Sequence, residues 1–404
     1  MADIRNYKIS VPSAAIDQLH HKLALSKFPD DTGTDGDDWG RGTPIANVKR
    51  IAKYWREEFN WASFEDRLNE LPHYETTMSL EGFDPFELHF IHRKSANPDA
   101  IPLLFVHGWP GSFLEATKIL PLLTAKQEDG PEFHLVVPSL PNFGFSSRIS
   151  KTGFGLRQYT DTCHKLMVKL GYEKYAAQGG DWGMYITTSI GNLYPESMLA
   201  LHLNFILAMP PPLTKSPLGF VRFLITHMLN LYTPQEQSGL KASQDYQIDG
   251  NSYLHLMRTR PNTIGAMLAD SPVGLLAWIY EKLITWTDDY PWTDQEICEW
   301  VSLYWFSRAG PAASVTICHE MFQGDWQADT GRGIPSAKLG FSYFPKEVAA
   351  TPRMWNRRLG DVVFEKEHEK GGHFPAWDQP EALVEDLRTM FNPEGPAYRA
   401  LHQG

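Results

Sequence analysis

The segment Lys174-Tyr-Ala-Ala-Gln-Gly-Gly-Asp181-Trp-Gly-Met-Tyr-Ile186 decides the fold. A short apolar run leads into Gly179-Gly180-Asp181-Trp182-Gly183, and a helical pattern follows from Met184. This order is typical of a strand, a very tight turn and a helix, with an acid at the apex of the turn. Aspartate and glycine are also common in ordinary turns, so the segment alone leaves the role of Asp181 open.

Strand and helix patterns alternate on both sides of this segment. Other strands are predicted over residues 74–80, 86–92, 101–108, 134–138, 199–204, 338–344 and 362–367. Helices are predicted over residues 112–124, 157–170, 184–194, 352–358 and 380–391. The first two strands suggest an antiparallel hairpin, and the alternation after them predicts a doubly wound, mostly parallel α/β sheet.

A helical insertion divides this predicted sheet. Residues 213–335 contain no convincing strand, and helices are expected over 218–230, 234–247, 262–269, 273–284, 293–308 and 312–322. An insertion at this point would lie above the carboxyl ends of the strands, where ligands bind, so we interpret it as a lid. The sheet domain then comprises residues 95–212 and 336–404. Residues 1–94 form an N-terminal arm and the first hairpin, with helices from Ser13 and over 45–59.

Composition excludes several classes of function. The 404 residues include 37 Lys and Arg against 48 Asp and Glu, and the net charge of −11 argues against a nucleic-acid partner. Three scattered cysteines form neither a disulfide framework nor a zinc spacing, and favour a reducing compartment. No signal-like or membrane-spanning apolar run is present. We therefore expect a soluble, cytoplasmic protein without a membrane anchor.

Two amides are candidates for an oxyanion hole. In the nucleophile elbow of α/β-hydrolases, G-x-S-x-G, the residue after the nucleophile gives one amide and the loop after the third strand gives another. The corresponding residues are Trp182 and Trp109, the latter in Val106-His107-Gly108-Trp109-Pro110. With Asp181 at the serine position, the covalent intermediate would be a carboxylate ester. His107 is expected to be a structural, hydrogen-bonded histidine.

A late histidine and an acid complete a candidate triad. His373 follows the last strand, in the chain order nucleophile, acid, histidine. An ionised Asp181 needs no base, so His373 would instead deprotonate the water that hydrolyses the ester. Glu347 follows the seventh strand and could orient His373. Asp361 and Asp325 compete for this role, and Glu347 is favoured by its place at the end of a strand.

The chain resembles a known family at these motifs. His107-Gly-Trp-Pro-Gly-Ser, Gly179-Gly-Asp-Trp-Gly and Gly371-Gly-His-Phe are similar to motifs of the microsomal-type epoxide hydrolases, including their soluble fungal members. Ile9-Ser-Val-Pro with Ile16-Asp-Gln-Leu-His resembles the family's N-terminal meander. The resemblance implies an α/β-hydrolase fold without a metal or organic cofactor. It also implies Asp181 as nucleophile, His373 as base and Glu347 as its acid partner.

The family also has two lid tyrosines that hydrogen-bond the epoxide oxygen and protonate the leaving alkoxide. The first is matched by Tyr253, in Ser252-Tyr253-Leu-His. The second position falls on Cys318 if one residue is inserted within 308–313. Either Tyr253 works alone, or another lid group (Cys318, His319 or Tyr304) substitutes, or epoxide opening is weakened.

The resemblance thus implies a hydrolase that opens a small apolar epoxide through an aspartyl ester. The same nucleophile could instead displace halide from a haloalkane, although the retained Tyr253 argues against this. A lactone or ester hydrolase and a non-catalytic, ligand-binding relative are further alternatives. Both a monomer and a homodimer are compatible with the composition.

Overall fold

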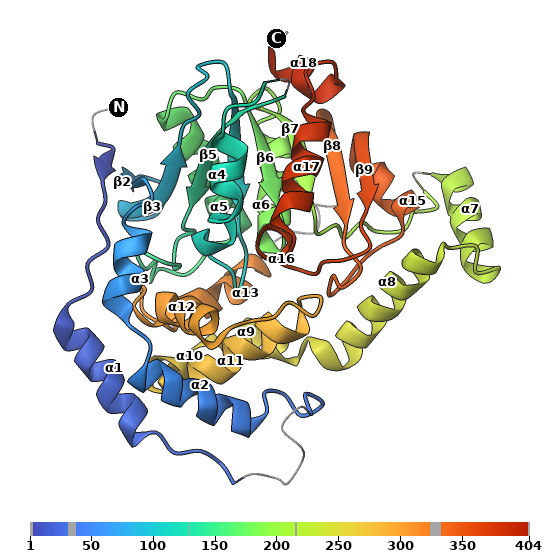
Figure 1. Ribbon diagram of the computed structural model, residues 1–404. Helices are drawn as coiled ribbons and strands as arrows, with labels where there is room; N and C mark the ends of the chain where they lie inside the picture. The colour runs from blue at the N-terminus through green and yellow to red at the C-terminus, as the bar shows by residue number, and fades with distance from the viewer. Residues whose placement is uncertain (1–2, 31–37, 129, 215, 324–332, 403–404) are drawn as a thin grey trace.

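The computed structural model describes residues 3–30, 38–128, 130–214, 216–323 and 333–402. Their centre is a nine-stranded sheet with the strand order β1-β2-β3-β5-β4-β6-β7-β8-β9 (Figure 1). The strands are β1 Arg5–Asn6, β2 His73–Met78, β3 Phe86–Arg93, β4 Ile101–Val106, β5 Phe133–Pro138, β6 Tyr175–Gly179, β7 Met198–Leu203, β8 Ile334–Tyr343 and β9 Gly360–Glu367.

The sheet changes from antiparallel to parallel across its width. β1, β2 and β3 pair antiparallel, β3 also pairs antiparallel with β5, and all pairs from β5 through β4 to β9 are parallel. The predicted hairpin and the mostly parallel sheet are therefore confirmed. The two-residue strand β1 was not predicted, because a pattern of period two cannot be recognised over two residues.

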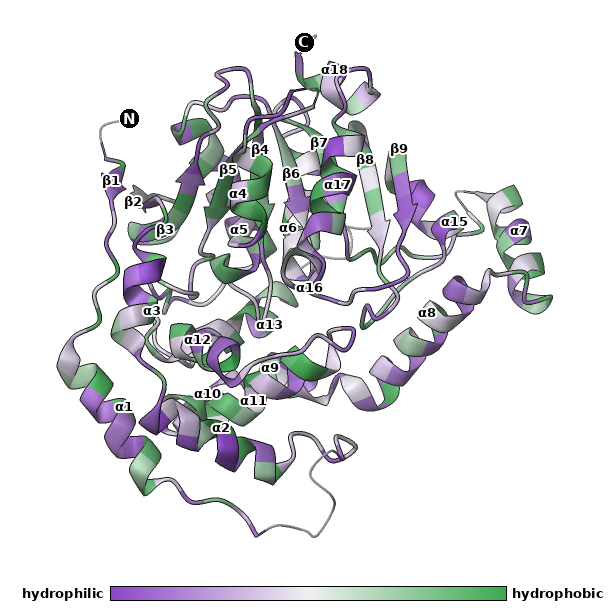
Figure 2. Cartoon of the chain, viewed as in Figure 1, coloured by the Kyte–Doolittle hydropathy of each residue, from purple (hydrophilic) through white to green (hydrophobic). Residues whose placement is uncertain are grey.

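Helices flank the strands, with α4 packed against α17 and α5 packed against α6. The helices and helical turns of this part are η1 Phe113–Ala116, α4 Ile119–Thr124, α5 Leu156–Lys169, α6 Trp182–Leu193, α15 Arg353–Asn356, η4 Arg357–Leu359, α16 Pro375–Asp378, α17 Pro380–Met390 and α18 Pro396–His402. The central strand β4 is buried on both faces, as its continuous apolar run predicts. Figure 2 shows hydrophobic residues concentrated on the central strands and α4.

The regular elements described in the insertion between β7 and β8 are all helical. Its elements are α7 Pro217–Met228, α8 Pro234–Asp245, the π-turn η2 Tyr246–Gly250, α9 Ser252–Thr259, α10 Pro261–Asp270, α11 Pro272–Thr285, α12 Asp294–Trp305, η3 Ala313–Val315 and α13 Thr316–Met321. In Figure 1 it lies at the end of the sheet to which the arrow of β8 points. The short helix α9 was not predicted. It packs against α13, a contact that a sequence pattern cannot show.

The N-terminal arm packs on this insertion. It contains α1 Ser13–Leu25, α2 Ile45–Glu57 and α3 Trp61–Leu68, of which α3 was not predicted. The indole Nε1 of buried Trp55, on α2, donates a hydrogen bond of 2.8 Å to Ser302 Oγ on α12. The arm therefore holds the insertion in place from the side opposite the sheet (Figure 1).

Membrane-spanning helices were also sought in the described ranges. None of these helices is by itself long and apolar enough to cross a bilayer. Only α10 and α11 taken together reach the required length, and they meet at a bend of 115°.

Candidate active site

The turn between β6 and α6 holds Asp181 in an unusual backbone conformation. Its φ is 47° and its ψ is −128°, a combination that costs an L-residue roughly 1–3 kcal/mol and is found mainly at functional sites. The turn also needs small neighbours. A Cβ on Gly183 would lie 1.9 Å from Val106 O, and one on Gly179 would lie 2.6 Å from Gly183 O. The Gly-Gly-Asp-Trp-Gly sequence is thus the one that lets this strained turn pack against β4.

Asp181, His373 and Glu347 are connected by two close contacts, with His373 between the two carboxylates. The Oδ2 atom of Asp181 lies 3.4 Å from His373 Nε2, and His373 Nδ1 lies 2.6 Å from Glu347 Oε1. His373 and Glu347 are both buried, whereas the side chain of Asp181 is 22% exposed. The three residues come from the ends of β6, β9 and β8, so the fold brings the predicted nucleophile, base and acid together. Their chemical roles remain predictions.

The electrostatic environment of His373 depends on both carboxylates. Burial acts to lower the pKa of His373, but the Glu347 carboxylate and the hydrogen bond and charge of Asp181 outweigh it and raise the pKa well above the ordinary value. The imidazole is therefore protonated while Asp181 is ionised. Loss of the Asp181 charge removes one of the two groups that hold the proton.

Asp181→Asn is expected to lower the pKa of His373, because asparagine has the shape of aspartate but neither its charge nor its ability to accept from imidazolium as strongly. The measurement is an NMR titration of the imidazole signals, with the His373 signal assigned by its loss in His373→Gln. A His373 pKa equal to that of the unmodified protein would contradict the coupling described above.

The two predicted oxyanion amides lie beside Asp181. The amide of Trp109 donates a hydrogen bond of 2.7 Å to Asp181 Oδ1. Trp182 is the first residue of α6, so its amide belongs to the N–H groups that have no partner within the helix. The Trp109 amide thus already binds the Asp181 carboxylate. The Trp182 amide lies in the same turn as Asp181 and has no partner within the helix.

The other residues considered for the acid and histidine roles either have other partners or lie outside the described residues. Asp361 pairs with Lys338 across β9 and β8 at 2.5 Å, and Asp325 lies outside the described residues. His107 is buried and accepts a hydrogen bond of 3.2 Å from the Leu140 amide, and burial lowers its pKa to about 4. The structural role predicted for His107 is thereby confirmed.

The insertion forms the opposite wall of a cavity of about 90 Å³ over Asp181. The cavity is mostly apolar, and its lining comprises Trp109, Asp181, Trp182, Tyr185, Phe205, Leu207, Tyr246, Tyr253, Leu254, Cys318, Phe322 and Ala349. Tyr253 stacks on Trp109 with ring centroids 5.3 Å apart. A small apolar molecule in this cavity would lie between the Asp181 carboxylate and the hydroxyl of Tyr253.

Of the three substitutes considered for a second lid donor, only Cys318 lines this cavity. Tyr304 donates its hydroxyl proton to Gly111 O at 2.5 Å, and His319 Nδ1 lies 2.7 Å from Arg258 O. Cys318 is buried in α13, and burial raises the pKa of its thiol well above the ordinary value. It stays protonated, but a thiol is a weak hydrogen-bond donor.

Sequence reasoning missed a second phenol. Tyr246 begins the π-turn between α8 and α9, and its hydroxyl lies 2.8 Å from that of Tyr253. The two tyrosines are seven residues apart, a spacing that places side chains on one face of a continuous helix. That signal was lost because the predicted helix ended at residue 247. Short π-turns of this kind are frequent at functional sites.

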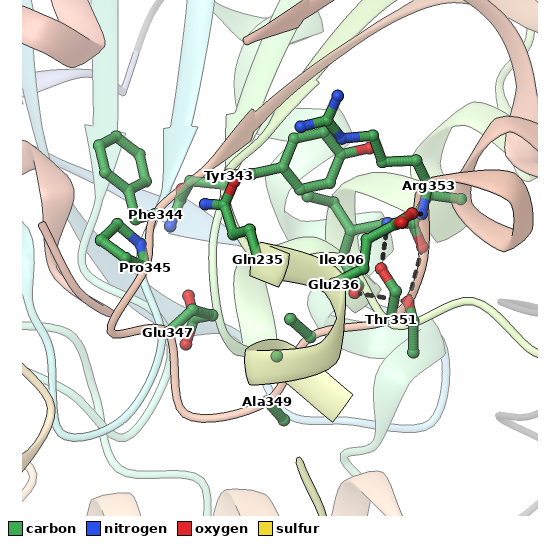
Figure 3. Close-up of a pocket in the computed structure, with 14 residues that line it drawn as sticks. Ile206, Gln235, Glu236, Tyr343, Phe344, Pro345, Glu347, Ala349, Thr351 and Arg353 are labelled. Carbon is green, nitrogen blue, oxygen red and sulfur yellow. Dashed lines mark hydrogen bonds between the residues drawn. The ribbon is translucent and has the colours of Figure 1, made fainter. Parts of the chain in front are cut away.

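A second, smaller cavity of about 40 Å³ lies beside Glu347, between α8 and the segment after β8 (Figure 3). Gln235 and Glu236 line it from α8, and Thr351 and Arg353 line it from the facing segment. Among the described residues, Glu347 Oε2 is buried and has no hydrogen-bond partner. Because an unpaired buried carboxylate oxygen is costly, we expect a water in this cavity to bind it.

Two family models match the chain. The one described as "Epoxide hydrolase N terminus" matches residues 4–116, which include the arm and the loop of Trp109. The one described as "alpha/beta hydrolase fold" matches residues 101–233, which include the Asp181 turn.

Known proteins are similar over most of the chain. Epoxide hydrolase 1 of Sus scrofa is 31% identical, over 96% of this chain and 88% of that protein. The structure of Aspergillus niger epoxide hydrolase is 34% identical, with 95% of each chain covered and a TM-score of 0.81. That of juvenile hormone epoxide hydrolase from Bombyx mori is 28% identical, with 95% and 93% covered and a TM-score of 0.85.

Proposed function

This chain belongs to the epoxide hydrolase family of α/β-hydrolases, and we propose that it opens a small apolar epoxide to a vicinal diol through an ester on Asp181. One observation carries the proposal: Asp181, which contacts His373 and through it Glu347, lines the same apolar cavity as Tyr253. A nucleophile on one side and an acid on the other are the two groups that ring opening requires.

Ester formation comes first. The Asp181 carboxylate attacks one oxirane carbon, the C–O bond breaks, and its electron pair goes to the epoxide oxygen. Tyr253 donates a hydrogen bond and then its proton to that oxygen, since an alkoxide is a poor leaving group without an acid. The hydrogen bond from the Trp109 amide holds Asp181 Oδ1, which leaves Oδ2 to react.

Ester hydrolysis comes second. Esterification removes the charge of Asp181, so the pKa of His373 falls, the imidazolium releases its proton, and the neutral imidazole can act as a base. It takes a proton from a water that attacks the ester carbonyl carbon, while Glu347 stabilises the imidazolium. The Trp109 and Trp182 amides would bind the oxyanion of the tetrahedral intermediate.

The lining of the cavity supports an apolar substrate. Apart from Asp181, its side chains are mostly aromatic or aliphatic, and they include Phe205, Leu207, Leu254 and Phe322. An aryl-substituted oxirane such as styrene oxide therefore suits the site better than a charged or heavily hydroxylated epoxide.

Steady-state assays with three substrate classes test the function. We expect styrene oxide to give diol over many turnovers, while a haloalkane and a lactone of similar size are converted at least about 100-fold more slowly, because a phenol acid matches an alkoxide leaving group. Product analysis by chromatography checks this. Faster halide release or lactone hydrolysis would instead support one of the alternative Asp-nucleophile reactions.

A further inference from the structure

Tyr253, the phenol that donates to the epoxide oxygen in this account, is hydrogen-bonded to a second phenol, Tyr246. The hydroxyl oxygens of Tyr246 and Tyr253 are 2.8 Å apart, and either can be the donor. When an epoxide oxygen accepts the proton of Tyr253, only Tyr246 can donate within the pair. The phenol oxygen of Tyr253 would then accept one hydrogen bond and donate another, without any movement of the lid.

A buried cation lies on the ring of Tyr253. The Lys282 ammonium, from α11, is 4.9 Å from the centre of this ring and 4.7 Å from that of Trp278. The Lys282 side chain is only 3% exposed, and its ammonium pairs with Glu281 at 2.9 Å. A cation over a phenol ring is attracted to the ring, and more strongly once the ring carries negative charge.

These contacts bear on the chemistry of Tyr253. Burial raises the pKa of Tyr253 well above the ordinary value, which makes the phenol a weak acid unless its anion is stabilised. Cys318, which takes the second tyrosine position if one residue is inserted within 308–313, is a weak donor. Tyr246 and Lys282 are the described groups that could stabilise a Tyr253 anion.

We propose that Tyr246 and Lys282 are positioning residues that make Tyr253 a sufficient acid on its own, Tyr246 by donating a hydrogen bond to its oxygen and Lys282 by its charge over the ring. This inference rests on the proposed epoxide opening and adds to it the way in which the lid works without a second tyrosine at position 318.

The protons balance over one turnover. During ring opening the epoxide oxygen takes the Tyr253 proton, and Tyr253 becomes a phenolate. The imidazolium that His373 carries in the free protein then passes its proton through solvent to this phenolate, which leaves a neutral imidazole. During ester hydrolysis this imidazole takes a proton from the attacking water and gives it to the departing alkoxide of the diol, and Asp181 is left as a carboxylic acid. That acid gives its proton to His373, so Tyr253, His373 and Asp181 all regain their starting forms.

Single-turnover kinetics test the inference, with the rates of ester formation from styrene oxide and of ester hydrolysis measured separately. We expect Tyr246→Phe to slow ester formation about 10- to 100-fold, the effect of one hydrogen bond to a charged group. Lys282→Met should slow it about 3- to 30-fold, and Lys282→Arg should restore most of the rate. Ester hydrolysis should stay unchanged, because neither residue acts on the attacking water or on the ester in this account.

The matched control is Tyr232→Phe, which removes a buried lid phenol that does not line the cavity, and it should leave both steps unchanged. A double-mutant cycle separates a positioning role from general packing. In a Tyr253→Phe background, Tyr246→Phe should have almost no further effect on ester formation, whereas a packing role would give an additive loss.

Different results overturn different claims. If the unmodified protein forms no ester from epoxides, the proposed function fails. If it forms the ester and Tyr246→Phe and Lys282→Met both leave that rate unchanged, only the present inference fails. A loss of ester formation in Cys318→Ala together with an unchanged rate in Tyr246→Phe would also overturn it, and would assign the second donor to Cys318.

Discussion

Asp181→Asn is expected to lower kcat for epoxide opening by about 10⁴-fold or more, because it removes the nucleophile on which both chemical steps depend. The change keeps the shape of the side chain, so the strained turn and the hydrogen bond from the Trp109 amide should persist. The fold should therefore be intact, and the loss should lie in chemistry alone. Diol formation measured under saturating substrate gives the size of the effect.

Two controls make this result specific. Asp361→Asn removes a carboxylate from an exposed ion pair on β9, and it should leave kcat unchanged. Asp181→Ala carries no side-chain amide, so slow hydrolysis of an introduced amide back to a carboxylate cannot restore its activity. Residual activity of more than a few per cent in Asp181→Ala would mean that another group opens the epoxide.

His373→Gln is expected to form the ester once and then stop. Asp181 is already ionised and needs no base to attack, but the ester needs a water that has lost a proton. We therefore expect about one equivalent of epoxide consumed per active site, followed by turnover slower by about 10³-fold or more. The ester should appear in the intact-protein mass spectrum as an adduct of the mass of the substrate.

This variant separates two roles for the histidine. If His373 were needed for ring opening, His373→Gln would show neither the initial consumption nor the adduct. Glu347→Gln should give a milder form of the same phenotype, since Glu347 acts only through the 2.6 Å contact with His373 Nδ1. A larger loss in Glu347→Gln than in His373→Gln would contradict this order.

The arrangement of Asp181, His373 and Glu347 was largely predictable because local constraints act on each of these residues. The turn of Asp181 needs glycines where a Cβ would collide with Val106 or with the turn itself. These glycines can be recognised directly in the sequence. Glu347 and His373 each follow a strand end, and parallel strands bring their carboxyl ends to one edge. Chain order and strand prediction therefore placed Asp181 and His373 at this edge, and the family resemblance supported Glu347 over Asp361 and Asp325.

The lid wall was less predictable because it depends on packing between helices. Tyr246 reaches Tyr253 only through the π-turn that interrupts the chain between α8 and α9. The sequence around Lys282 is typical of an exposed helical lysine. In the structure its side chain is buried against the rings of Tyr253 and Trp278. No periodicity in α11 distinguishes a lysine that snorkels to water from one held beneath a tyrosine.

The covalent ester on Asp181 is the central claim, and a single turnover in water labelled with ¹⁸O tests it most directly. With enzyme in excess over styrene oxide, water attacks the ester carbonyl, so the label should enter the Asp181 carboxylate and the diol should carry an unlabelled oxygen that came from aspartate. Mass spectrometry of the peptide that contains Asp181 and of the diol measures both. Label in the first-turnover diol, with none in Asp181, would contradict the ester mechanism.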